Sequence, residues 1–168
     1  MTRPAGHPGP HEVALPAVIA VAIEAHARAE QPNEACGLII GDRAPAAGGR
    51  ALRFEPAGNL AESPCRYEID PADLLRLTLA TDDADEVFWG IVHSHVGTPA
   101  VPSPADIGLA RYPDALYLLL SFAEDQADPV TGAPSLRAWR IVEGAAHEVR
   151  ISVTAPGGAH PAMGRRGG

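Results

Sequence analysis

His93-Ser94-His95 and, after a seven-residue loop, Ser103-Pro104-Ala105-Asp106 stand near the middle of the chain. Two histidines one residue apart lie on the same side of an extended backbone, because side chains alternate along a strand. Ser103 and Pro104 are typical of the N-cap and first position of a helix, where a carboxylate such as Asp106 favours the positive end of the helix dipole. The stretch therefore predicts a strand that ends in two histidines and a helix that directs Asp106 back toward the loop.

These three side chains are typical ligands of a metal ion. Two imidazoles and a carboxylate suit Zn²⁺, and three protein ligands leave the fourth tetrahedral position to water, whereas structural zinc sites close all four positions. Zinc in such a site brings the pKa of its water toward neutrality. We therefore expect His93, His95 and Asp106 to hold one catalytic Zn²⁺ per chain.

Apolar periodicity divides the rest of the chain into strands and helices. Helices are expected over residues 16–30, from Asp70-Pro71 onward and over residues 104–111. The second helix is expected to bury Leu74, Leu75, Leu77 and Leu79. The expected strands are residues 36–40, 50–55, 66–69, 87–92, 115–122, 136–142 and 147–153, the last two forming a hairpin. We expect one domain over residues 13–153, a flexible Gly/Pro-rich leader over residues 1–12 and a flexible tail over residues 154–168.

The composition indicates a globular protein and argues against two kinds of partner. The 168 residues carry a net charge of −8, and all thirteen basic residues are arginine, with Arg165-Arg166 as the one basic pair, so no nucleic-acid partner is expected. The apolar runs are too short to span a bilayer, and Met1 to Pro10 lacks the pattern of a signal peptide. We therefore expect no membrane partner and a cytoplasmic location. Cys36 and Cys65 are expected to be small buried side chains without a disulfide.

A second segment upstream extends the pattern to a known family. It reads Glu34-Ala35-Cys36-Gly37-Leu38-Ile39-Ile40-Gly41. Together the two segments resemble the signatures Glu-x-Cys-Gly-x-x-x-Gly and His-x-His-x(7)-Ser-x-x-Asp of the JAMM/MPN+ metalloproteases. Weaker similarities extend the resemblance over about residues 13 to 150. The chain departs from the pattern at Val96, where many members have proline, but this position carries none of the expected ligands.

The resemblance implies a fold, a reaction and a substrate. The fold is α/β, a curved mixed β-sheet flanked by helices in a single domain of the JAB/MPN (cytidine deaminase-like) type. The reaction is hydrolysis of a peptide or isopeptide bond after the C-terminal Gly-Gly of a ubiquitin-like or sulfur-carrier protein, with Glu34 as general base. Ser103 is expected to donate a hydrogen bond to the oxyanion, worth on the order of 3 kcal/mol. If it is only a helix cap, its loss costs roughly 1 kcal/mol of stability.

Other interpretations compete with this one. A zinc deaminase needs a Cys-x-x-Cys pair that the chain lacks, and a cupin-type iron site needs a distant third histidine on a strand instead of a helix-borne aspartate. The main alternative is a non-catalytic MPN-like metal-binding interaction module, although such members usually lose ligands and all five candidate residues are present here. The sequence leaves open the leaving group, a homodimer, and whether the segment Gly164–Gly168 mimics the product in a neighbouring molecule.

Overall fold

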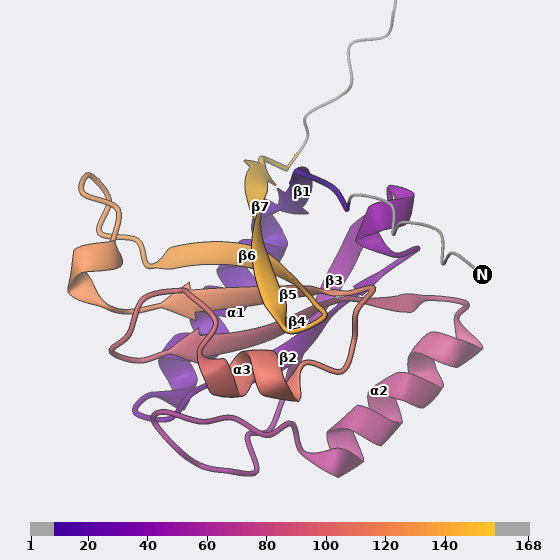
Figure 1. Ribbon diagram of the computed structural model, residues 1–168, viewed down its shortest axis with the longest axis horizontal. Helices are drawn as coiled ribbons and strands as arrows, with labels where there is room; N and C mark the ends of the chain where they lie inside the picture. Colours follow the sequence, from indigo (N-terminus) through magenta and orange to yellow (C-terminus); the bar gives the residue numbers. More distant parts are fainter. Residues whose placement is uncertain (1–8, 157–168) are drawn as a thin grey trace, which may run out of the picture.

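A mixed seven-stranded β-sheet forms the centre of the protein in the computed structural model, which describes residues 9–156 (Figure 1). The strand order is β1-β7-β6-β5-β4-β2-β3, with β1 parallel to β7, β4 parallel to β5 and the other pairs antiparallel. The edge strands β1 and β3 approach one another, so the sheet is strongly curved. The strands are β1 (Glu12–Pro16), β2 (Cys36–Gly41), β3 (Ala51–Ala57), β4 (Val87–His95), β5 (Leu116–Ser121), β6 (Ser135–Val142) and β7 (Ala145–Thr154).

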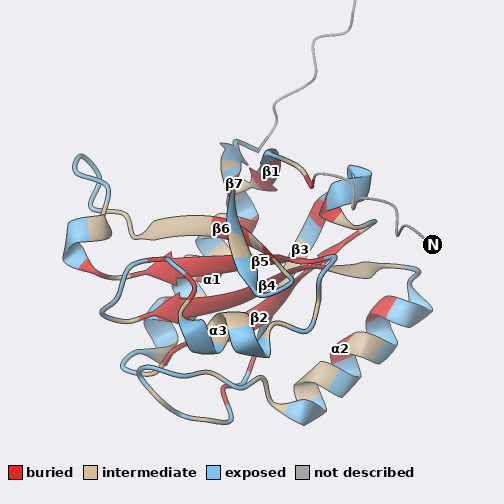
Figure 2. Cartoon of the chain, viewed as in Figure 1, coloured by how far each residue is buried: buried red, intermediate tan, exposed pale blue. Residues whose placement is uncertain are grey.

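Helices cover both faces of this sheet. The helices are α1 (Ala17–Glu30), α2 (Pro71–Asp83) and α3 (Pro104–Leu109), with short 3₁₀ turns at Pro45–Ala47 and Glu124–Gln126. One apolar core lies between the sheet and α1, and a second lies on the opposite face, where α2 and α3 contribute Leu77 and Ile107. Strand β5 contributes side chains to both cores, because Leu118 packs on the α1 face of the sheet and Leu119 packs on the opposite face. Strands β2 and β5 are therefore buried along their whole length, and β4 is buried from Trp89 onward (Figure 2). The predicted curved mixed sheet in a single domain is confirmed.

Strand β4 places both histidines on the face that α3 covers. Ile91 belongs to the core on that face, and the alternation of side chains puts His93 and His95 on the same side. Strand β2 pairs with β4 so that Cys36 lies opposite His93, and the Ser94 N–H donates to the Ala35 carbonyl at 3.0 Å. This pairing brings Glu34, which lies two residues before the start of β2, to the end of β4.

The predicted hairpin is confirmed, but β7 begins two residues earlier than expected, at Ala145, and includes Thr154, which was predicted to belong to the flexible tail. Glu143 and Gly144 form its two-residue turn and have φ of 53° and 77°. Positive φ at both central residues is typical of a type I′ turn, and glycine adopts it without steric cost.

Several local predictions were wrong. Strand β1 was missed, and its first residue falls in the segment predicted as a flexible leader. Residues 66–69 form no strand, because only an isolated bridge joins Asn59 to Ile69. Leu75 and Leu79 of α2 are exposed, since a helix presents residues 74, 77, 78 and 81 to one side and residues 75 and 79 to another. Cys65 is exposed, whereas Cys36 is buried as expected, and both are free thiols.

Two further expectations concern membrane-spanning helices and the two ends of the chain. No helix within residues 9–156 is long and apolar enough to cross a membrane. The expectations for residues 1–8 and for the Gly164–Gly168 segment lie outside the described residues.

Candidate metal centre

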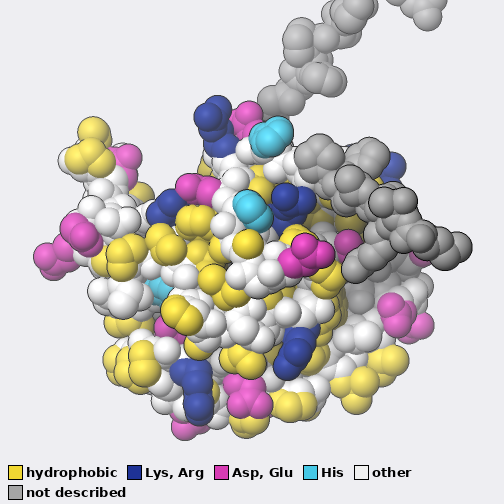
Figure 3. Space-filling model, in the orientation of Figure 1, with side chains coloured by type: hydrophobic (Ala, Val, Ile, Leu, Met, Phe, Trp, Pro, Cys, Tyr) yellow, Lys and Arg dark blue, Asp and Glu magenta, His cyan; other side chains and the backbone are white. Residues whose placement is uncertain are grey.

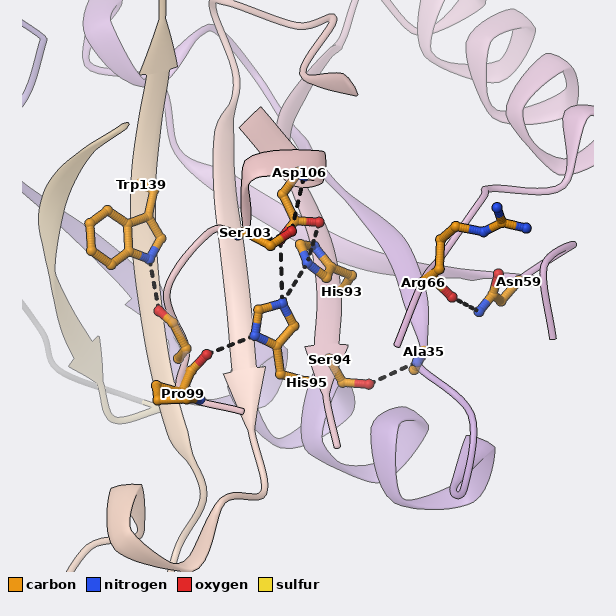
Figure 4. Close-up of polar contacts among 11 residues, drawn as sticks. Ala35, Asn59, Arg66, His93, Ser94, His95, Pro99, Ser103, Asp106 and Trp139 are labelled. Carbon is orange, nitrogen blue, oxygen red and sulfur yellow. Dashed lines mark hydrogen bonds and ion pairs between the residues drawn. The ribbon is translucent and has the colours of Figure 1, made fainter. Parts of the chain in front are cut away.

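The side chains of His93, His95 and Asp106 converge on one point between β4 and α3 (Figure 4). The two Nε2 atoms of the histidines are 3.1 Å apart. Asp106 Oδ1 lies 3.4 Å from His93 Nε2, and Asp106 Oδ2 lies 3.4 Å from His95 Nε2. Both histidines are buried, so these polar atoms gather in a place that excludes most water.

This arrangement fits a zinc ion. Ligand bonds of roughly 2.0 to 2.1 Å to nitrogen or oxygen give a tetrahedron whose edges measure about 3.3 to 3.4 Å. The three observed separations of 3.1, 3.4 and 3.4 Å are close to such edges. The donor set of two imidazoles and one carboxylate also has the composition expected for zinc with an open fourth position.

The two histidines are held in different ways. His95 Nδ1 donates to the Pro99 carbonyl at 2.7 Å, which leaves Nε2 free to accept or to bind a metal. His93 Nδ1 is buried and finds no hydrogen-bond partner among the described residues. The ring of His93 instead stacks on Tyr67, with the centroids 4.2 Å apart and the planes inclined by 18°.

The loop between β4 and α3 is fixed through three consecutive carbonyls. His95 holds the carbonyl of Pro99, Ser121 Oγ donates to Thr98 O at 2.6 Å, and Trp139 Nε1 donates to Ala100 O at 3.0 Å. Sequence reasoning missed Ser121 and Trp139, because both lie on other strands and no local pattern marks them. These bonds position the loop although Val96 replaces the proline common in the family.

A capping box joins Asp106 to the start of α3. Ser103 Oγ accepts from the Asp106 N–H at 3.1 Å, and Asp106 Oδ2 accepts from the Ser103 N–H at 2.7 Å. The predicted helix start is therefore correct, and the cap aims the carboxylate at the histidines. Since Ser103 Oγ acts as an acceptor in the cap, its own proton is free to donate to another group.

Glu34 lies beside these ligands and is buried, with 5% of its surface exposed. Its N–H donates to Ser63 O at 2.8 Å, and its carbonyl accepts from Asn59 Nδ2 at 3.0 Å. Burial raises the pKa of the Glu34 carboxyl to about 7; the charge of His95 lowers it and that of Asp106 raises it further. A carboxyl with such a pKa exchanges a proton readily near neutral pH.

The ligand side chains have shifted pKa values as well. Burial alone would raise the pKa of Asp106, but hydrogen bonds from both histidines and from the Ser103 backbone hold it well below its usual range. Burial lowers the pKa of His93. Burial acts in the same direction on His95, but Asp106, the Pro99 carbonyl and Glu34 outweigh it and raise the pKa of that ring. Asp106 is thus ionised at neutral pH, as a zinc ligand must be.

Fold and site together define a JAMM-type hydrolase, and comparisons with known proteins agree. Residues 16–142 match the family described as prokaryotic homologs of the JAB domain, and the chain belongs to this family. The resemblance to the JAMM/MPN+ proteins is therefore confirmed.

The chain is also similar to several named proteins. It is 40% identical over 132 residues to the CysO-cysteine peptidase of Mycobacterium tuberculosis, covering 79% of this chain and 84% of the relative. It is 32% identical over 104 residues to the desampylase of Haloferax volcanii, covering 59% of this chain and 73% of the relative. The solution structure of a protein from Desulfitobacterium hafniense is 31% identical, with a TM-score of 0.69 over 84% of this chain and 92% of that one.

Proposed function

We propose that the protein is a zinc-dependent peptidase that cleaves the peptide or isopeptide bond after the C-terminal Gly-Gly of a ubiquitin-like or sulfur-carrier protein. The observation that carries this proposal is the convergence of His93, His95 and Asp106 at tetrahedral spacing beside the buried carboxyl of Glu34. The names of the relatives, a peptidase acting on CysO-cysteine and a desampylase, support the class of substrate.

Each candidate residue has one chemical role in this proposal. His93, His95 and Asp106 would hold zinc, which would supply Lewis acidity and make water acidic enough to lose a proton near neutral pH. Glu34 takes that proton at its carboxylate and passes it to the leaving amine. Ser103 donates its free hydroxyl proton to the oxyanion that develops on the scissile carbonyl.

The surface near the site suits a protein substrate. Leu60, Val101 and Leu109 are 56%, 43% and 58% exposed and lie on the segments that carry or flank the site residues. Figure 3 shows such hydrophobic side chains exposed among acidic and basic ones on the face that α3 occupies. Exposed apolar side chains of this size can contact a folded partner as well as its extended tail. A homodimer and a cytoplasmic location stay predictions.

Cleavage of a designed fusion tests the proposal. The substrate is a bacterial ubiquitin-like carrier that is extended by a short peptide after its Gly-Gly. We expect the protein to release this peptide by cleavage after the second glycine. We expect a zinc chelator to stop the cleavage and added zinc to restore it. The same fusion with Ala-Ala in place of Gly-Gly is the control for substrate recognition. Release that survives the chelator would contradict the zinc mechanism. Zinc-dependent binding of the carrier without any release would favour the non-catalytic module instead.

Ser103→Ala separates the two roles of this hydroxyl. We expect the free energy of unfolding to fall by about 1 kcal/mol, because the cap of α3 is lost, and kcat to fall about 100-fold, because one oxyanion donor is lost. Ser103→Thr, which keeps a hydroxyl at the same place, is the matched control. Urea unfolding and steady-state kinetics measure the two effects, and an unchanged kcat in Ser103→Ala would leave Ser103 as a helix cap alone.

A further inference from the structure

Asn59 is a buried polar side chain outside the proposed ligands and catalytic groups. It is 8% exposed, and all four of its hydrogen-bonding positions are filled. Its Nδ2 donates to the carbonyls of Glu34 and Arg66, each at 3.0 Å. Its Oδ1 accepts from the N–H groups of Ala61 at 3.0 Å and Glu68 at 2.9 Å. One amide therefore joins Glu34 to residues 59–68, which we call the Asn59 loop. Figure 4 shows the bond from Asn59 to Arg66 within this loop.

The backbone of Glu34 is tied to this loop on both sides. Its carbonyl is held by Asn59, and its N–H donates to Ser63 within the same loop at 2.8 Å. The next residue, Ala35, is tied to β4, because its N–H donates to Ser94 Oγ at 2.8 Å. The position of the Glu34 carboxyl relative to the histidines of β4 thus depends on the Asn59 loop as well as on the pairing of β2 with β4.

The same loop holds the Tyr67 ring against His93, a proposed zinc ligand. Asn59 bonds to the backbone of both neighbours of Tyr67, through the carbonyl of residue 66 and the N–H of residue 68. The Tyr67 ring stacks on His93, whose Nδ1 has no hydrogen-bond partner among the described residues. His95, in contrast, is oriented by its bond to Pro99. The aromatic face of Tyr67 therefore supplies the restraint on the His93 ring that a hydrogen bond supplies elsewhere in the site.

We propose that Asn59 is a positioning residue for both halves of the site: it holds the Glu34 backbone where the carboxyl serves as base, and it keeps Tyr67 stacked on His93. The inference rests on the proposed function for the roles of Glu34 and His93. Neither Asn59 nor Tyr67 takes part in proton transfer in this scheme. They act through the two residues that they orient.

Measurements of zinc affinity and of kcat separate the effect on His93 from the effect on Glu34. The zinc dissociation constant is measured by competition with a chelator, which needs no substrate, and kcat is measured on the extended carrier at saturating zinc. We expect Asn59→Ala and Tyr67→Leu to raise the zinc dissociation constant about 10-fold, because both free the His93 ring. Tyr67→Phe keeps the stacked ring and is expected to bind zinc within about twofold of the wild type.

At saturating zinc the two variants are expected to differ. Tyr67→Leu regains a kcat within about threefold of the wild type, whereas Asn59→Ala stays about 10- to 100-fold lower, because Glu34 is still misplaced. Asn59→Asp keeps the acceptor for residues 61 and 68 but loses the bonds to the carbonyls of Glu34 and Arg66, so it is also expected to lower kcat. It serves as the deciding variant if Asn59→Ala does not fold.

Thr81→Val is the matched control for a loss of stability alone. Thr81 is buried, and its hydroxyl donates to two carbonyls of α2, which carries none of the site residues. We expect this variant to melt at a lower temperature with unchanged zinc affinity and kcat.

If the Asn59 variants behave like Thr81→Val, Asn59 is merely structural and the inference fails. If Tyr67→Leu binds zinc like the wild type, the part concerning His93 fails. The zinc affinities test the effect of Asn59 and Tyr67 on His93 even if the protein cleaves no carrier.

Discussion

Glu34→Gln is expected to abolish hydrolysis while the protein keeps its fold and its zinc. The amide has the shape of the carboxylate but cannot take a proton from water, so we expect kcat to fall by about 10² to 10⁴. The backbone bonds of Glu34 to Ser63 and Asn59 do not involve the side chain and remain. Kinetics on the extended carrier, together with the zinc content of the purified variant, measure the two outcomes.

Glu124→Gln changes an exposed carboxylate in the 3₁₀ turn after β5 and is expected to leave kcat unchanged. If Glu34→Gln binds zinc normally and retains activity within about threefold of the wild type, another group is the base. Loss of zinc together with activity would instead make Glu34 part of the metal site.

The same substitution is expected to stabilise the metal-free protein above neutral pH. Burial raises the pKa of Glu34 from 4.5 to about 7, so the folded state binds this proton more tightly than the unfolded state. Stability is therefore lost as the pH rises from about 4.5 through 7, by an amount of roughly 2 to 3 kcal/mol. Glu34→Gln removes that loss. Thermal unfolding with chelator should show the variant more stable than the wild type at pH 8 and equal to it near pH 4, and equal stability at pH 8 would contradict the burial effect.

Much of the site could be predicted because its signals are local in sequence. The spacing of His93 and His95 and the cap of Ser103 on Asp106 both act within a few residues, so the strand end and the helix start were readable from neighbouring residues. Glu34 followed from a family resemblance, since nothing in its own neighbourhood distinguishes it from an acid at the end of a strand. Strands whose apolar runs are buried on both faces, such as β5, were found for the same local reason.

The parts that were missed depend on contacts between distant residues. Strand β1 is an edge strand whose one partner strand within residues 9–156 is β7, far along the chain, and its five residues carry a weak pattern of their own. Residues 66–69 look like a strand but belong to the Asn59 loop, where the amide of Asn59 replaces a partner strand for the Arg66 carbonyl and the Glu68 N–H. Trp139 likewise holds Ala100 across 39 positions of sequence. Such restraints become visible only when the sheet is assembled.

Asp106→Asn is expected to lose zinc while α3 keeps its start. The amide oxygen can still accept from the Ser103 N–H, so the capping box survives, but a neutral amide is a poor ligand for zinc. Since replacing even the outer partners of a metal ligand costs about 10- to 100-fold in affinity, we expect the loss of a charged ligand to weaken zinc binding by at least about 100-fold, and activity to fall with it at limiting zinc.

Asp73→Asn provides a matched control because Asp73 occupies the same position in α2 that Asp106 occupies in α3. Both carboxylates lie in the first turn of a helix that begins with proline, and both accept a backbone N–H, from Gly58 in the case of Asp73. Asp73→Asn should therefore bind zinc within about twofold of the wild type. If Asp106→Asn binds zinc as tightly as that control, Asp106 is a helix cap and not a ligand. If it loses zinc while Ser103→Ala retains it, the carboxylate binds the metal independently of the cap that orients it.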